Sequence, residues 1–109
     1  MNAVTQVTTG TVLRDLAQLG TDPDAIADRL TGLGITGMLH EPGDCAIARY
    51  LTTLPGVDRA LVGGYGITIR AGGERITLAQ PAAIRDFRRR FDNGLYPQLV
   101  AARRPGGEQ

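Results

Sequence analysis

The single cysteine of this 109-residue chain, Cys45, is the residue whose type and position are best suited to chemistry. A helix is expected to begin near Asp44, capped by it or by Gly43. A cysteine in the first turn of a helix has its thiolate stabilised by the helix dipole, and Arg49 lies one turn further along the same face. His40 precedes Cys45 by five residues. A Cys–His pair can support nucleophilic catalysis, so these three residues form a candidate reactive-thiol site.

Cys45 also has a purely structural interpretation, which we favour. A small thiol is most often a buried packing residue, and its reactivity depends on its surroundings. Catalysis by a Cys–His pair further requires a group that orients the histidine, and the sequence identifies none near His40. The sequence therefore favours a non-catalytic protein, and a small enzyme that uses Cys45 remains the third alternative.

The longest stretch with alternating apolar residues runs from residue 60 to residue 80, ALVGGYGITIRAGGERITLAQ, and predicts a β-hairpin. Gly72 and Gly73 suit a two-residue turn, because such turns need positive φ angles. This turn places apolar residues on one face of the hairpin, pairing Ile69 with Ile76 and Ile67 with Leu78.

The same register brings two arginines together on the opposite face of the hairpin. Thr68 pairs with Thr77, and Arg70 pairs with Arg75. Like charges directly opposite one another destabilise a sheet. Either Glu74 relieves the repulsion, or the two guanidinium groups await an anion, or they splay apart into solvent, which is the interpretation we favour.

Four more arginines lie on a predicted final helix, AAIRDFRRRF, which opens at Gln80-Pro81 and stops at Asn93-Gly94. Spacings of four residues predict two ion pairs within it, Asp86 with Arg90 and Arg88 with Asp92. Two arginines remain unpaired on its outer face. The candidate residues for binding a nucleic acid or a protein partner are therefore Arg70, Arg75, Arg85 and Arg89, although a solvated face would look the same in sequence.

The remaining pattern predicts three N-terminal helices. They cover residues 11–19, residues 22–33 after the start signal Thr21-Asp22-Pro23-Asp24, and residues 44–54. Short strands are expected at 35–39 and 57–62. The fold class is α+β: three helices, a small antiparallel sheet of two or three strands, and a C-terminal helix packed on it. Residues 11–100 form one domain, preceded by a flexible segment 1–10 and followed by a disordered tail 101–109.

This order of elements resembles a winged helix-turn-helix. DPDAIADRLTGLGITG resembles the first helix of that motif, CAIARYLTTLPGV stands in the place of a recognition helix, and GYGITIRAGGERITL stands in the place of the wing. The resemblance implies nucleic-acid binding. Two features oppose it: the connection before the third helix is long, and the outward positions of that helix offer Arg49 as their only basic side chain.

The composition argues against several classes of function. The net charge is +1, tryptophan is absent and aromatic residues make up 5%, so the chain as a whole has no drive toward nucleic acid or membrane. One cysteine and one histidine exclude a structural zinc site, and VGGYG lacks the Lys-Ser/Thr of a phosphate loop, so neither a metal nor a cofactor is expected. The N-terminus has no signal-peptide pattern, and a cytoplasmic protein is predicted. All twelve basic residues are arginine and none is lysine. Together with the abundance of alanine and glycine, this indicates the codon bias of a GC-rich bacterial genome.

The charges are separated along the chain. Residues 1–56 hold three arginines and six acids, a net charge of −3, whereas residues 80–104 hold six arginines and two acids, a net charge of +4. Such polarity orients partners or supports self-association. We therefore predict a small non-catalytic regulatory or protein-interaction module of a bacterial cell, with a protein partner or a homodimer. The alternative is a winged-helix-like nucleic-acid-binding regulator that uses the hairpin and the arginine-rich last helix.

Overall fold

The computed structural model describes residues 7–64 and 66–101, and within them it confirms the predicted α+β fold. Three helices come first: α1 (Thr9–Leu19), α2 (Pro23–Leu33) and α3 (Ala46–Thr52). The strands β1 (Arg59–Val62), β2 (Gly66–Ala71) and β3 (Glu74–Ala79) follow, and the helix α4 (Ala82–Asp92) and a short 3₁₀ turn, η1 (Pro97–Leu99), end the described chain. The predictions for residues 1–6 and 102–109 lie outside the described residues.

Helix boundaries follow from local capping. Thr8 caps α1 by a reciprocal pair of bonds with Thr11, so the helix begins two residues before the predicted start. Asp22 caps α2 by accepting a bond of 2.9 Å from the Ala25 N–H, with Pro23 in the first helical position, as predicted. Gly34, at a φ of 74°, ends this helix in a left-handed conformation.

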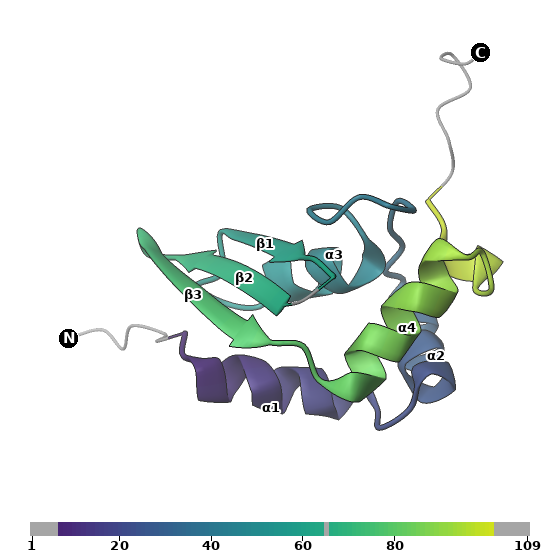
Figure 1. Ribbon diagram of the computed structural model, residues 1–109, viewed down its shortest axis with the longest axis horizontal. Helices are drawn as coiled ribbons and strands as arrows, with labels where there is room; N and C mark the ends of the chain where they lie inside the picture. Colours follow the sequence, from purple (N-terminus) through teal and green to yellow (C-terminus); the bar gives the residue numbers. More distant parts are fainter. Residues whose placement is uncertain (1–6, 65, 102–109) are drawn as a thin grey trace, which may run out of the picture.

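The three strands form an antiparallel sheet in the order β1-β2-β3 (Figure 1). The predicted register of the hairpin is confirmed: Ile69 pairs with Ile76, and Ile67 pairs with Leu78. Gly72 and Gly73 have φ angles of 60° and 84°, which a two-residue turn requires. Apolar side chains of all three strands point to one face, here called the inner face.

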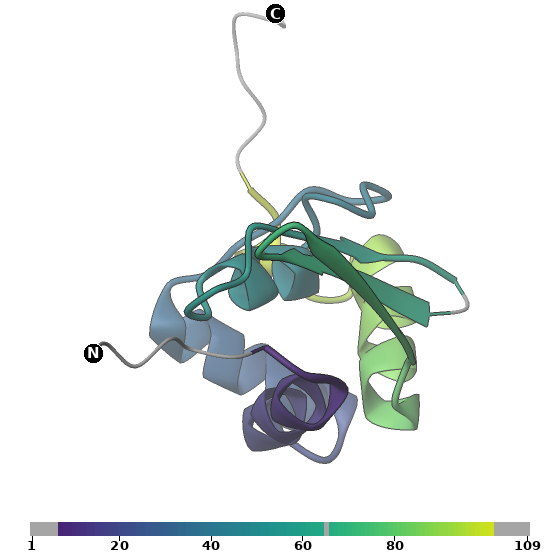
Figure 2. The same cartoon turned by 90° about the vertical axis from the view of Figure 1, so that its left-hand side faces the viewer.

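Every helix of the described chain lies on the inner side of the sheet, so the molecule has two layers (Figures 1 and 2). The opposite face, here called the outer face, carries no helix of the described residues. Phe87 of α4 is buried and stacks on Phe91 at 6.0 Å and on Tyr96 at 5.3 Å between ring centroids. The Tyr96 hydroxyl donates to Asp24 Oδ1 at 2.8 Å and thereby fastens the segment after α4 to α2.

Two local predictions were wrong. Residues 35–39 form no strand; only Gly37 makes a single parallel bridge to Val100, held by bonds of 2.8 Å to Leu99 O and from the Ala101 N–H. A side chain at Gly37 would lie 2.1 Å from Ala46 N, so this backbone is pressed against the start of α3 instead of extending a sheet. Helix α3 is capped by Cys45, not by Asp44 or Gly43.

Candidate functional site

Three arginines form a row across the outer face of the sheet. Arg59 of β1 pairs with Arg70 of β2, and Arg70 pairs with Arg75 of β3. Neighbouring strands lie about 4.8 Å apart, so the three Cα atoms span about 10 Å. All three side chains are exposed. We call this row the arginine rung.

No ion pair neutralises the arginine rung among residues 7–64 and 66–101; the four ion pairs found there use other arginines. Glu74 does not relieve it, because Glu74 precedes Arg75 by one residue and alternation directs it to the opposite face. Asp58 lies beside the rung, but its Oδ2 accepts the Gly72 N–H at 3.1 Å and holds the hairpin turn. Three like charges thus stand side by side without an ion pair in the described structure, and the Asp58 carboxylate is the acid nearest to them in the hollow they share.

The rung borders a shallow hollow of about 510 Å³ on the outer face. Leu61 and Thr68 form the floor beside the arginines, and Leu61 is 38% exposed. The hollow therefore offers three cations and one carboxylate, Asp58, next to an apolar side chain, and this excess of positive charge suits an anionic ligand with some apolar surface.

The arginines of the last helix do not join this rung. Arg75 stands at the turn end of β3, whereas α4 begins beyond the other end of that strand, about 13 Å away along the strand (Figure 1). Arg85 was predicted to have no ion-pair partner, and this was wrong: its Nε lies 3.7 Å from Asp86 Oδ1. Arg89 is exposed and has no ion pair within the described residues.

One of the two ion pairs predicted within α4 is present, and the other is replaced. Arg88 Nη1 lies 3.3 Å from Asp92 Oδ2, as the spacing predicted. Arg90 turns away from Asp86 and lies 3.4 Å from Asp24 Oδ1 on α2. The acidic and basic parts of the sequence therefore meet within one molecule at this point, which removes part of the predicted charge separation.

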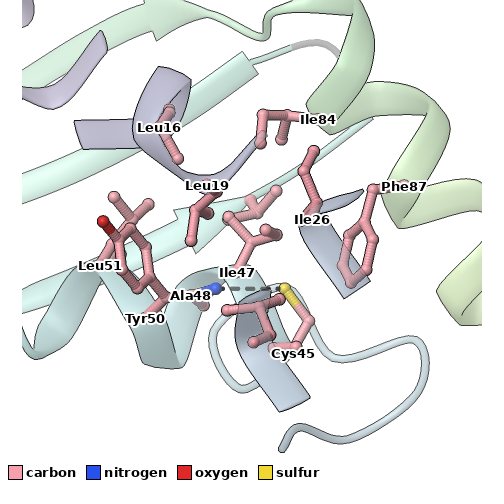
Figure 3. Close-up of a cluster of buried hydrophobic side chains, with 14 of the residues drawn as sticks. Leu16, Leu19, Ile26, Cys45, Ile47, Ala48, Tyr50, Leu51, Ile84 and Phe87 are labelled. Atoms are coloured by element: carbon pink, nitrogen blue, oxygen red, sulfur yellow. Dashed lines mark hydrogen bonds between the residues drawn. The ribbon is translucent and has the colours of Figure 1, made fainter. Parts of the chain in front are cut away.

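Cys45 is buried and not activated. Its side chain is 3% exposed, and its Sγ accepts the Ala48 N–H at 3.5 Å (Figure 3). Burial raises the pKa of the Cys45 thiol, and the nearby Asp92 carboxylate raises it further, which outweighs the opposing backbone hydrogen bonds. The predicted stabilisation of a thiolate by the helix dipole is therefore overcome by desolvation.

Arg49 and His40, which were predicted to form a reactive-thiol site with Cys45, make hydrogen bonds with other residues. Arg49 forms a bidentate salt bridge with Asp44: its Nε donates to Oδ1 at 2.7 Å and its Nη2 donates to Oδ2 at 3.1 Å. Its Nη1 also donates to Thr36 Oγ1 at 3.3 Å. His40 adopts a φ of 61°, and its backbone N–H donates to Asp92 Oδ1 at 3.0 Å.

His40 and Cys45 do line the same hollow, of about 200 Å³, together with Arg88 and Asp92. However, no hydrogen bond joins the His40 ring to the thiol in the described part of the chain. The hollow thus lacks the base-to-nucleophile contact on which a cysteine nucleophile depends.

Helix α3 does not have the surface of a recognition helix. Five of its seven residues are buried, and only Arg49 and Thr52 reach the surface. Because Arg49 is held by Asp44, little of α3 remains for reading base edges. The winged-helix resemblance therefore extends to the order of the elements but not to an exposed third helix.

Comparison with known proteins adds no family: no family model, curated protein or solved structure matches this chain. Within the described residues, no cluster of histidine, cysteine and acidic side chains has the arrangement of a metal site. No helix of that part is long and apolar enough to cross a membrane.

Sequence reasoning missed Arg59. Ala60 and Val62 are the inward residues of β1, so alternation alone places Arg59 on the outer face. Its alignment with Arg70 depends on the connection between β1 and β2, whose geometry the sequence does not determine.

Proposed function

We propose that this protein is a non-catalytic interaction module of the bacterial cytoplasm that binds an acidic segment of a partner protein on the outer face of its sheet. The observation that supports this proposal is the arginine rung, three aligned arginines that form no ion pair within the described residues and outnumber the one acid, Asp58, in the hollow beside them. A partner's carboxylates would relieve the repulsion between the arginines and gain charge-assisted hydrogen bonds from them. Binding and relief of repulsion would thus occur in one step.

A protein partner fits the surroundings of the rung better than a nucleic acid does. Leu61 supplies an apolar contact beside the arginines, and interfaces between proteins combine arginine with apolar residues. Single-stranded nucleic acids need exposed aromatic rings for stacking, but every aromatic residue of the described chain is buried: Tyr50, Phe87, Phe91 and Tyr96.

The alternative function, nucleic-acid binding through the hairpin and the last helix, is supported by the rung alone. Phosphates could bind its three arginines, but Arg85 and Arg89 belong to α4, which begins beyond the far end of β3, and a row of about 10 Å would contact few phosphates. Weak, salt-sensitive binding to any sequence would be the result.

A second copy of the chain is a poor occupant of the outer face. Two outer faces laid against one another would bring six arginines into the interface, against two copies of Asp58, the one acid among the described residues that line the hollow. The partner is therefore a different protein that carries the carboxylates.

The experiment reverses one charge of the rung. Arg70→Glu should abolish capture of the partner from the native cell extract, whereas Arg89→Glu, an exposed arginine outside the rung, should leave it unchanged. Circular dichroism checks that both variants fold. A partner that is retained equally by Arg70→Glu and the wild type would overturn the proposal.

The same proteins are tested on duplex DNA in a mobility-shift assay at physiological salt, where no saturable binding is expected. DNA binding that falls steeply with salt, and whose salt dependence decreases by about one unit when Arg70 is replaced, would favour the alternative function.

A further inference from the structure

The two edges of the sheet differ in how they are covered. At the β1 edge, the Val62 N–H donates to Pro42 O at 2.9 Å, and Gly43 lies so close that a side chain there would meet Leu61 Cδ2 at 3.1 Å. At the other edge, β3 has no backbone hydrogen bond to any described residue outside β2. Figure 1 shows β3 along the margin of the sheet. An open edge strand is a template for another strand.

The register identifies which backbone groups of β3 have no hydrogen-bond partner among residues 7–64 and 66–101. Arg70 O accepts the Asp58 N–H at 2.8 Å, and Gly66 O accepts the Gly63 N–H at 2.9 Å, so even-numbered residues of β2 bond toward β1. Odd-numbered residues of β2 therefore bond to β3, through their partners Glu74, Ile76 and Leu78. The N–H and C=O groups of the alternate residues point to the open edge: Arg75, Thr77 and Ala79.

One residue, Arg75, belongs both to the open edge and to the arginine rung. Arg75 presents its backbone to the open edge and its side chain to the outer face, where it is the last member of the rung. A strand added beside β3 would place a side chain directly opposite Arg75, with Cβ atoms about 5 Å apart. An acidic residue there would add a fourth, negative member to the row.

The inner side of the same edge is apolar beyond Glu74, which stands at the turn end of β3. Ile76 is only half-buried against the core, and Leu13, on the neighbouring helix α1, is 38% exposed. Side chains of an added strand that alternate to this side would be best matched by apolar residues.

We propose that the partner is captured by strand addition: an extended segment with alternating acidic and apolar residues pairs with β3 and places a carboxylate beside Arg75. This inference rests on the proposed function, because it names the form in which the acidic partner binds. The backbone bonds supply affinity, and the alternating side chains supply specificity.

A second copy of the chain could pair with the backbone groups at the open edge of β3, but it would not neutralise the arginines of the rung. Antiparallel pairing of two β3 strands centred on Thr77 would place Arg75 opposite Ala79 of the other copy. The rung would then remain without a counter-charge. An acidic strand satisfies both features, and we therefore assign it as the occupant.

The experiment selects a library of random short peptides on the immobilised full-length protein. Peptides with an acid at every second position should be enriched, and methylation of alternate backbone nitrogens should weaken a selected peptide. Thr77→Pro removes an N–H that faces the open edge without breaking a bond to β2, and should reduce binding about threefold to tenfold. Thr77→Val keeps that N–H and is the matched control.

The outcomes separate this inference from the proposed function. Acidic peptides that need Arg70 but bind equally to Thr77→Pro, or after methylation, would overturn strand addition and leave the arginine rung as the binding surface. Enriched peptides without acids would overturn both. A dimer of the unliganded protein that dissociates on Thr77→Pro would show that a second copy occupies the edge. A wild-type protein that selects no peptide, together with aggregation of a variant in which Arg75 is replaced, would show that Arg75 only prevents edge-to-edge association.

Discussion

The arginine rung should lower the stability of the fold, and by different amounts at its centre and its ends. Arg70 has an arginine on each side, whereas Arg59 has one such neighbour. Cross-strand pairs contribute roughly 0.2–1 kcal/mol, and exposure to solvent keeps these pairs in the lower half of that range. Arg70→Gln should therefore stabilise the protein by about 0.5–1 kcal/mol at low ionic strength, and Arg59→Gln by about half as much.

Thermal melts measure this difference. Unfolding a chain of 109 residues carries an entropy of about 0.23 kcal/mol/K, so 1 kcal/mol corresponds to about 4 °C. Arg70→Gln should raise the Tm by about 2–4 °C at low salt, and the gain should vanish near 1 M salt, where the Debye length is about 3 Å. Arg89→Gln, outside the rung, is the control and should change little. A loss of stability, equal gains for Arg59 and Arg70, or a gain that persists in high salt would refute the assumed repulsion.

Three further predictions concern the core, the thiol and the surface ion pair. Phe87→Ala should cost about 3–5 kcal/mol, because Phe87 is buried against two rings, whereas Leu95→Ala, at a site 61% exposed, should cost little in the same urea titration. Cys45 should react slowly with a disulfide reagent at neutral pH and rapidly after unfolding, because burial raises the thiol pKa; fast reaction of the folded protein would contradict this. The hydrogen bond from Arg49 lowers the pKa of Asp44, so their pairing stabilises the fold above about pH 4 and is lost as pH falls through the folded-state pKa. The stability difference between wild type and Asp44→Asn should accordingly shrink in acid, and a difference that is constant with pH would show that the carboxylate's charge is not involved.

Elements governed by neighbouring residues could be predicted from the sequence. Two consecutive glycines and strict alternation determine the hairpin register, so Ile69 and Ile76 were paired correctly. The start of α2 followed from an aspartate before a proline. In both cases the decisive interactions span a few residues, and the side-chain pattern records them directly.

Features that depend on distant parts of the chain could not be predicted. Arg90 pairs with Asp24, which lies 66 residues away, in place of the nearby Asp86. Cys45 is buried, as the favoured interpretation of the sequence had it, but the helix N-terminus beside it gave no sign that tertiary burial would outweigh the helix dipole in setting its pKa. Arg59 joins the rung only because β1 docks on β2 in one particular register.

The arginine rung persists because the opposite face of the sheet determines the register. A slip of β3 by one residue along β2 would turn Ile76 and Leu78 from the inner face to solvent, at a cost far above the screened repulsion of exposed arginines. A slip of two residues would keep the faces but lose the turn at Gly72 and Gly73, whose positive φ angles close the hairpin. The apolar core thus holds three like charges in line against their own repulsion. Local conflicts that a fold maintains in this way are expected at functional positions, which is the physical reason for placing the partner at this row of the sheet.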